Sequence, residues 1–182
     1  MTGRSEAVAA REPFDLPPLS LANRVGDLGG GDDQYLRYLE IGGRLRQAVI
    51  RTLPADWSFD GRRVLDFGAG AGRMLRHFGA EAEVAEFWGC DLDGPSVEWM
   101  KRHLEPPFVI FANDEEPPLA VDPGFFDLVV AVSVFTHLTT TWSSWLAELH
   151  RVLRPDGLLL ATFMGKGMSM WVAGEPWDDR WV

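Results

Sequence analysis

The sequence contains few of the residues that build metal centres and covalent cross-links. Its 182 residues include one cysteine, Cys90, and four histidines without the spacing of metal ligands. A single cysteine excludes an internal disulfide and a cysteine-rich metal site. We expect Cys90 to be a small buried apolar residue at the end of a strand. We therefore predict no metal.

Positive charge and long apolar runs are also scarce. The chain carries 17 Lys and Arg against 27 Asp and Glu, and its formal net charge is −10. Because binding to phosphates needs clustered Lys and Arg, we expect no nucleic-acid partner. No apolar run approaches the roughly 20 residues that span a bilayer, and the N-terminus lacks the apolar core of a secretion signal. These absences predict a cytoplasmic protein without a membrane partner.

The length suits one domain with a sizeable core. Residues 1–33 are rich in Pro, Gly and charge, which is typical of an extended, partly ordered arm. From Asp32 or Asp33 the apolar pattern becomes helical, as one or two helices interrupted at Gly42 and Gly43. Residues 34–163 then form the main domain, and residues 164–182 a short tail.

The most informative stretch runs from Arg63 to Phe78. Residues 64–67 are apolar except for Asp66, which suits a buried parallel strand that ends at a site. Residues 68–72 read Gly-Ala-Gly-Ala-Gly, a turn almost without side chains, and helical spacing begins near Gly72. A ligand can approach bare backbone at such a strand–turn–helix junction, where unpaired N–H groups point outward.

The spacing of the glycines separates two classes of cofactor. A dinucleotide-binding fingerprint requires a third glycine where this chain has Arg73. The pattern present is D-x-G-x-G-x-G, which places the Asp66 carboxylate two residues before the turn. The negative charge of that carboxylate does not suit a pyrophosphate. It suits the positively charged amino group at the methionine end of S-adenosylmethionine. The motif resembles motif I of the class I S-adenosylmethionine-dependent methyltransferases.

A second strand, residues 87–91, ends in Asp91, about twenty residues after the turn. At that separation a nucleotide-binding fold places a carboxylate against the ribose hydroxyls. Asp93 is the alternative, but Asp93-Gly94-Pro95 is typical of a helix cap. We therefore favour Asp91.

Two further segments strengthen the resemblance, which extends from about Gly61 to Phe163. Residues 126–138, FDLVVAVSVFTHL, resemble the fourth strand and exit loop of the family, and LHRVLRPDGLLLATF resembles its signature before and along the fifth strand. The resemblance implies a Rossmann-like α/β fold, doubly wound around a mostly parallel sheet. It also implies an acid after the strand 108–112 that accepts a hydrogen bond from adenine; Asp114 matches best, and Asn113 is the residue that could contribute beside it.

The predicted cofactor is thus S-adenosylmethionine, and the predicted site gathers at the carboxyl ends of the strands. The cofactor-binding candidates are Asp66, Gly68, Ala69, Gly70, Gly72, Asp91, Leu92, Asn113, Asp114, Val132 and Ser133. His137, just beyond the fourth strand, is the candidate general base; the alternative is that it packs locally in the exit loop. In the helix from Trp142, we expect the tryptophans to belong to the core.

Only residues 164–182 follow Phe163, so we expect the last antiparallel strands of the family to be absent. The fifth strand would then present an open apolar edge, a possible surface for self-association or a partner. The predicted function is methyl transfer to a small-molecule acceptor. The alternatives are a noncatalytic module with the same fold and, less favoured, an NAD(P)-dependent oxidoreductase.

Overall fold

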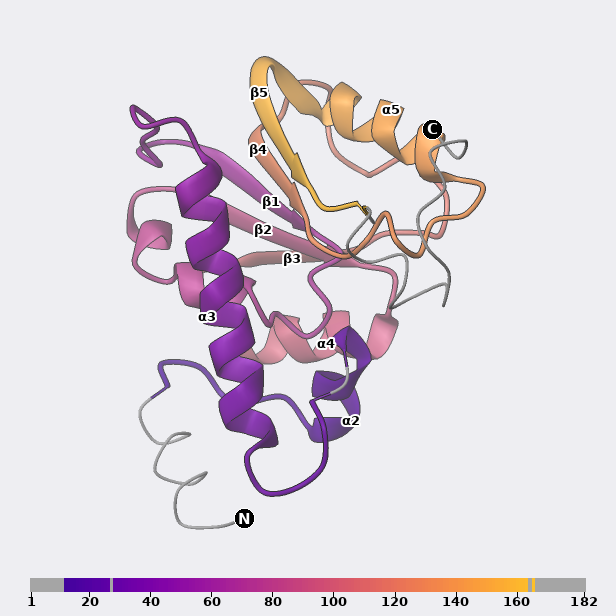
Figure 1. Ribbon diagram of the computed structural model, residues 1–182. Coiled ribbons are helices and arrows are strands. Elements are labelled where there is room, and N and C mark those ends of the chain that lie inside the picture. Colours follow the sequence, from indigo (N-terminus) through magenta and orange to yellow (C-terminus); the bar gives the residue numbers. More distant parts are fainter. Residues whose placement is uncertain (1–11, 27, 164, 166–182) are drawn as a thin grey trace.

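The computed structural model describes residues 12–26, 28–163 and 165, and its centre is a five-stranded parallel sheet (Figure 1). The strands are β1 (Arg63–Phe67), β2 (Glu86–Asp91), β3 (Val109–Ala112), β4 (Phe126–Ala131) and β5 (Leu153–Ala161), in the order β3-β2-β1-β4-β5. The chain proceeds outward from β1 in one direction and then crosses to β4. The predicted doubly wound fold is confirmed, and its switch point lies between β1 and β4.

Helices cover both faces of the sheet. On one face, α3 (Gln34–Thr52), the 3-10 turn η2 (Leu75–Phe78) and α4 (Gly94–His103) pack on residues of β1, β2, β3 and β4. On the other face, α5 (Trp142–Val152) packs against Leu65, Phe67 and Val129. Cys90 is fully buried in this second cluster, and burial raises the pKa of its thiol, so it is a core residue as expected.

The described part of the arm before α3 (Gln34–Thr52) contains short helical turns. It contains α2 (Leu19–Ala22) and the 3-10 turn η1 (Asn23–Val25), and Leu28 is buried beside Tyr38. The helix that follows is a single one: α3 continues through Gly42 and Gly43 without the interruption that the glycines suggested. A Cβ atom at Gly42 would lie 2.0 Å from the carbonyl oxygen of Arg73, so this glycine allows close packing.

Three other expectations from the pattern were wrong in detail. The helix expected from Gly72 is only the one-turn η2, because the backbone at Gly72 is still left-handed, with φ of 74°. Trp145 belongs to the core, but Trp142, at the first position of α5, is 48% exposed. Strand β5 begins at Leu153, earlier than the strand expected from Leu158, because Leu153 already pairs with Phe126 of β4 before the register shifts.

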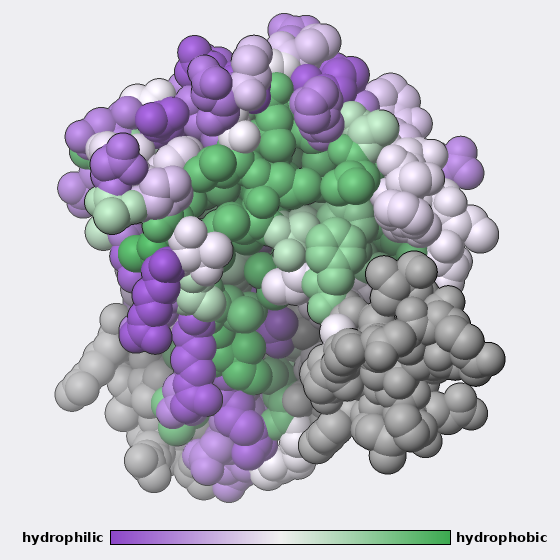
Figure 2. Space-filling view, turned by 45° about the horizontal axis from the view of Figure 1, so that its top comes forward, coloured by the Kyte–Doolittle hydropathy of each residue, from purple (hydrophilic) through white to green (hydrophobic). Residues whose placement is uncertain are grey.

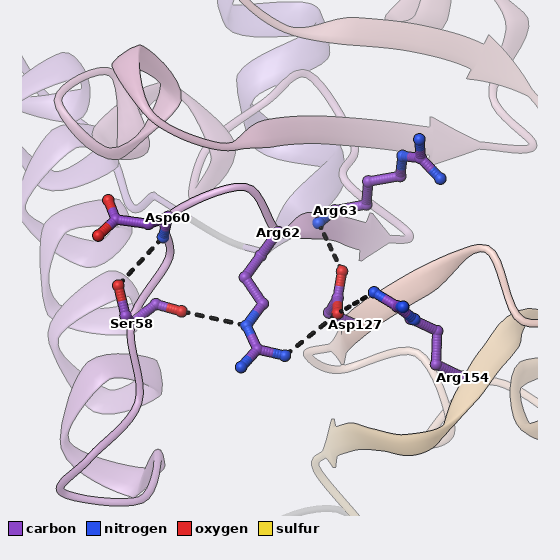
Figure 3. Close-up of polar contacts among 6 residues, drawn as sticks. All are labelled: Ser58, Asp60, Arg62, Arg63, Asp127 and Arg154. Carbon is purple, nitrogen blue, oxygen red and sulfur yellow. Dashed lines mark hydrogen bonds and ion pairs between the residues drawn. The ribbon is translucent and has the colours of Figure 1, made fainter.

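A charge cluster joins the amino ends of β1, β4 and β5 (Figure 3). The buried carboxylate of Asp127 accepts hydrogen bonds from the Arg63 backbone N–H at 2.9 Å, from Arg62 at 3.1 Å and from Arg154 at 3.0 Å. Arg62 is held in turn by the carbonyl of Ser58. Because this cluster lies at the end of the sheet away from the strands' carboxyl ends, we interpret it as structural.

Among the described residues, β5 is an edge strand that pairs only with β4. Its Leu158 and Leu160 are half-buried and pack on the same cluster as α3. Figure 2 shows a hydrophobic region at the centre of this side of the molecule. The short tail expected over residues 164–182 lies outside the described residues, apart from Gly165. In the described ranges, no helix has the length and apolar character needed to cross a membrane.

Candidate functional site

A cavity of about 660 Å³ opens at the carboxyl ends of the strands, a volume within the range of small-molecule sites. It is bounded by the exits of β1, β2, β3 and β4, by Leu45 of α3, and by residues of η1. Every predicted site residue lines this cavity except Gly70 and Gly72. The fold therefore brings together residues that are up to about seventy positions apart in sequence.

Asp66 lies at the base of the cavity, on the face of β1 that points toward α3. Its side chain is almost fully buried, and its Oδ2 atom has no hydrogen-bond partner among the described residues. Burial, and then the nearby charge of Asp91, raises the pKa of Asp66 to about 7. The positive charge of Arg73 lowers this pKa but does not outweigh the other two effects. An unpartnered buried carboxylate oxygen is costly, and a cationic ligand would offset that cost.

The glycine turn after β1 supplies a wall of backbone. Gly68 has φ of 78°, and a Cβ at this position would lie 2.4 Å from a methyl carbon of Val134. Gly72 faces away from the cavity, where a Cβ would lie 2.4 Å from Leu104 at the end of α4. Gly68 thus lets Val134 pack closely on the turn, whereas Gly72 lets the turn pack on α4.

Asp91 closes the second side of the cavity and also holds the turn. Its Oδ2 accepts a hydrogen bond from the backbone N–H of Gly70 at 2.7 Å, and its Oδ1 accepts one from Asp93 N–H at 2.8 Å. Gly70 therefore contributes by supporting the turn through Asp91. Asp93 caps α4 by accepting from Ser96 N–H, as the pattern predicted, and it also pairs with Arg24.

The end of β3 contributes an amide and an exposed acid. Asn113 is half-buried and donates from Nδ2 to the carbonyl of Asp114 at 2.8 Å, while its Oδ1 has no partner among the described residues. Asp114 is exposed, and Leu92 on the neighbouring strand exit is 64% exposed. Asn113 is therefore the more enclosed of the two polar candidates on this wall.

The exit of β4 forms the remaining wall. Ser133 has φ of 61°, and its N–H donates to Thr162 Oγ1 at 2.7 Å. His137 is exposed and lines the cavity, and its backbone N–H donates a hydrogen bond to the carbonyl of Val134 at 2.9 Å. Hydrogen bonds thus hold the backbone of the exit loop locally, and His137 is one of the residues that line the cavity.

Sequence reasoning missed several residues that line the cavity. The most consequential are Arg73, which follows the glycine turn, and Asn23, Arg24 and Gly26 of the η1 region. The position of Arg73 directly after the glycine turn indicates that it lies near the ligand. From the sequence, Arg73 served only to exclude the dinucleotide fingerprint. The η1 residues carry no local signal, because their approach to the cavity depends on how the arm folds back.

The residues present fit the amino-acid end of S-adenosylmethionine. The orphaned Oδ2 of Asp66 suits an ammonium group, and Gly68 beside it lines the cavity with backbone. Within the described ranges there is no group of three or more His, Cys, Asp or Glu arranged to hold a metal ion. A parallel sheet of this order, with a glycine turn after β1 and an acid at the end of β2, defines an α/β protein that binds a nucleoside-containing cofactor.

Comparison with known proteins gives the family. Residues 65–161 match the family described as "Methyltransferase domain", and the chain belongs to this family of S-adenosylmethionine-dependent methyltransferases. The predicted class and the predicted cofactor are thereby confirmed, since S-adenosylmethionine is the cofactor of the family.

Individual relatives agree with this assignment. The chain is 27% identical to the ubiquinone biosynthesis O-methyltransferase of Cereibacter sphaeroides over 137 residues, which cover 72% of this chain and 54% of the relative. It is 31% identical to the malonyl-[acyl-carrier protein] O-methyltransferase of Geobacter sulfurreducens, over 75% of this chain and 51% of the relative. The fold is similar to that of the PH0226 protein from Pyrococcus horikoshii, with a TM-score of 0.55 and 21% identity over 75% of this chain and 62% of that one. The chain spans about half the length of the curated relatives it matches.

Proposed function

We propose that this chain binds S-adenosylmethionine in the cavity at the strand ends and that methyl transfer to an oxygen atom of a small molecule takes place there. The observation that carries the proposal is the unpartnered Oδ2 of buried Asp66 beside the glycine turn. A carboxylate oxygen in that position can accept a hydrogen bond from the ammonium group of the ligand, which gives the buried oxygen the partner it lacks in the protein.

The other walls suit the nucleoside part of the same ligand. Asp91 uses one lone pair of each oxygen within the protein and keeps further acceptor capacity for ribose hydroxyls. The unpartnered Oδ1 of Asn113 supports a hydrogen bond from the adenine amino group. Leu92, an exposed leucine on the rim, offers an apolar surface for the purine ring.

The protein's contribution to the chemistry is chiefly geometric. S-adenosylmethionine, when bound, supplies a methyl group on a positively charged sulfur. In-line displacement requires that the acceptor atom and the methyl carbon be held close and aligned, which Val132 and Ser133 at the β4 exit would do. His137, on the same wall, is the candidate that takes a proton from an acceptor hydroxyl.

The choice of oxygen as the acceptor atom rests on the relatives. The two curated relatives described above are named as O-methyltransferases. The half-buried apolar residues around the β4 exit, Val132, Val134 and Leu138, favour an acceptor with an apolar part.

Two measurements test the proposal. Calorimetry with S-adenosylhomocysteine should show one site of micromolar affinity, and a panel of hydroxyl-bearing and carboxyl-bearing acceptors should yield S-adenosylhomocysteine from S-adenosylmethionine. Binding without turnover on any acceptor would favour a noncatalytic module. Absence of binding at millimolar ligand by the folded chain would overturn the proposal, and binding of NADH instead would favour an oxidoreductase.

The role of His137 needs its own variant. His137→Ala should lower kcat by about 100-fold or more if the imidazole is the base, with little change in the affinity for S-adenosylhomocysteine. Full turnover of that variant would mean that alignment alone drives the reaction, and that His137 packs locally in the exit loop.

A further inference from the structure

The cavity contains a second charged group that the proposed function leaves unused. Arg73 follows the glycine turn, is half-buried and lines the same cavity as Asp66. Burial lowers the pKa of its guanidinium, and the charges of Tyr38 and Asp66 act in the opposite direction. A half-buried guanidinium in a ligand cavity requires a physical explanation.

No hydrogen bond or ion pair within the described residues uses the Arg73 guanidinium. Its Nη1 lies near Gly26, where a Cβ would be 3.5 Å away, so the arm approaches it with bare backbone. The other arginine on this cavity, Arg24, is already paired with Asp93. Asp66 interacts with Arg73 through their charges but forms no direct ion pair with it.

The cavity therefore presents one unpartnered carboxylate oxygen and one unpaired guanidinium that do not satisfy each other. A ligand carrying both an ammonium and a carboxylate, separated by a single carbon atom, complements the two groups together. Guanidinium is well suited to the carboxylate because its planar fork can donate two parallel hydrogen bonds.

We propose that Arg73 binds the carboxylate, and Asp66 the ammonium, of the amino-acid end of the cofactor, so that the two residues recognise an α-amino acid zwitterion as a pair. This inference rests on the proposed function, because it names how the same site holds S-adenosylmethionine. Arg73 also lies next to Gly42 of α3, whose missing side chain lets the helix approach the carbonyl of Arg73. The packing of α3 on the turn therefore fixes the backbone from which the Arg73 side chain extends.

The test compares two ligands that differ only in the carboxylate. Calorimetry would use S-adenosylhomocysteine and its decarboxylated analogue, both of which carry an uncharged sulfur. The wild-type chain should bind S-adenosylhomocysteine about 10- to 100-fold more tightly than the analogue, as expected for hydrogen bonds between charged groups. In Arg73→Gln this preference should fall to less than about threefold, with little change in the affinity for the analogue.

Arg24→Gln is the matched control, since Arg24 lines the same cavity but is paired with Asp93. It should keep the preference for the carboxylate, and any loss of affinity should be equal for the two ligands. Loss of the preference in Arg24→Gln and not in Arg73→Gln would overturn the assignment. Equal weakening of both ligands by Arg73→Gln would overturn it as well, because that pattern indicates a structural role.

A second measurement keeps the inference testable if Arg73→Gln fails to fold. In the wild-type chain, the Nε–H signal of Arg73 in a ¹H–¹⁵N spectrum should shift on addition of S-adenosylhomocysteine and stay in place with the decarboxylated analogue. The signal would be assigned by its absence in Arg73→Lys. Equal shifts with both ligands would contradict the inference alone, whereas a wild-type chain that binds neither ligand would overturn the proposed function too.

Discussion

Asp91 and Gly70 are joined by a hydrogen bond of 2.7 Å from the glycine N–H to the carboxylate Oδ2, which ties the end of β2 to the turn after β1. The same carboxylate accepts from Asp93 N–H. One side chain thus shapes the wall of the cavity and, in the proposed function, faces the ribose. A change at Asp91 should consequently affect both the turn and the ligand.

Asp91→Asn should weaken S-adenosylhomocysteine binding by more than about tenfold and lower the free energy of unfolding by about 1–2 kcal/mol. An amide has only one acceptor oxygen, so one of the two N–H groups loses its partner. Isothermal calorimetry and urea unfolding would measure the two effects. Glu98→Gln, at an exposed carboxylate of α4, serves as the control and should change neither. Unaltered binding by the folded Asp91→Asn chain would remove Asp91 from the site.

The acidity of Asp66 should give opposite pH trends for stability and for binding. Since burial and then Asp91 raise the pKa of Asp66 to about 7, the folded chain without ligand holds a proton that the unfolded chain has lost. Stability from this group is therefore present at low pH and is lost as pH rises from about 4 through 7, by a few kcal/mol.

Affinity for S-adenosylhomocysteine should move the other way and fall below pH 7, because the ammonium favours the ionised carboxylate. Asp66→Asn should be weaker at pH 8 and should show neither trend. Calorimetry and thermal unfolding between pH 5.5 and 8 would measure this. An affinity in the wild-type chain that stays constant over this range would contradict the role of Asp66.

Neighbouring glycines of α3 should respond oppositely to alanine. A Cβ at Gly42 would meet the Arg73 carbonyl at 2.0 Å, whereas at Gly43 the nearest atom, in His77, is 3.9 Å away. Gly42→Ala should destabilise the fold by about 1–3 kcal/mol through overpacking and weaken cofactor binding by displacing the turn. Gly43→Ala should stabilise it by about 0.5–1 kcal/mol through helix propensity. Similar melting temperatures for the two variants would argue against the close contact of α3 and the turn.

The ion pair of Arg24 with Asp93 connects η1 to the cap of α4 at the edge of the cavity. Both side chains are partly exposed, so the pair is worth at most about 1 kcal/mol. Arg24→Gln should speed dissociation of S-adenosylhomocysteine about two- to fivefold, and high salt should reduce the difference. Stopped-flow measurement would detect this. Arg102→Gln, which removes an exposed pair with Glu98, should leave the dissociation rate as in the wild type.

Asp127 should matter for stability and not for the ligand. Burial raises the pKa of its carboxyl, but the bonds from Arg63 N–H, Arg62 and Arg154 outweigh this and hold the pKa below its ordinary value. Its contribution is present above about pH 4 and is lost as pH falls further. Asp127→Asn should cost about 2–3 kcal/mol at pH 7, and the deficit should shrink in acid. Weaker cofactor binding by the folded variant would show that the cluster communicates with the cavity.

The sequence alone determined the class of fold, the cofactor and the strand exits that carry Asp66, Asp91 and Ser133. These follow from local patterns: apolar runs of strand length, a turn without side chains, and an acid at a strand end. Parallel strands place such ends on one side of a sheet, so no distant contact needs to be known.

Only the tertiary structure decided which residues complete the site and why some glycines are needed. Arg73 and Arg24 reach the cavity because α3 and the folded-back arm pack against the turn, and Gly42 proves necessary only once α3 lies on the Arg73 carbonyl. Trp142 fits the helical pattern yet is exposed, because it lies at the first turn of α5, beyond the sheet. Periodicity reports which face of an element is apolar, whereas contacts between elements depend on how the whole chain packs.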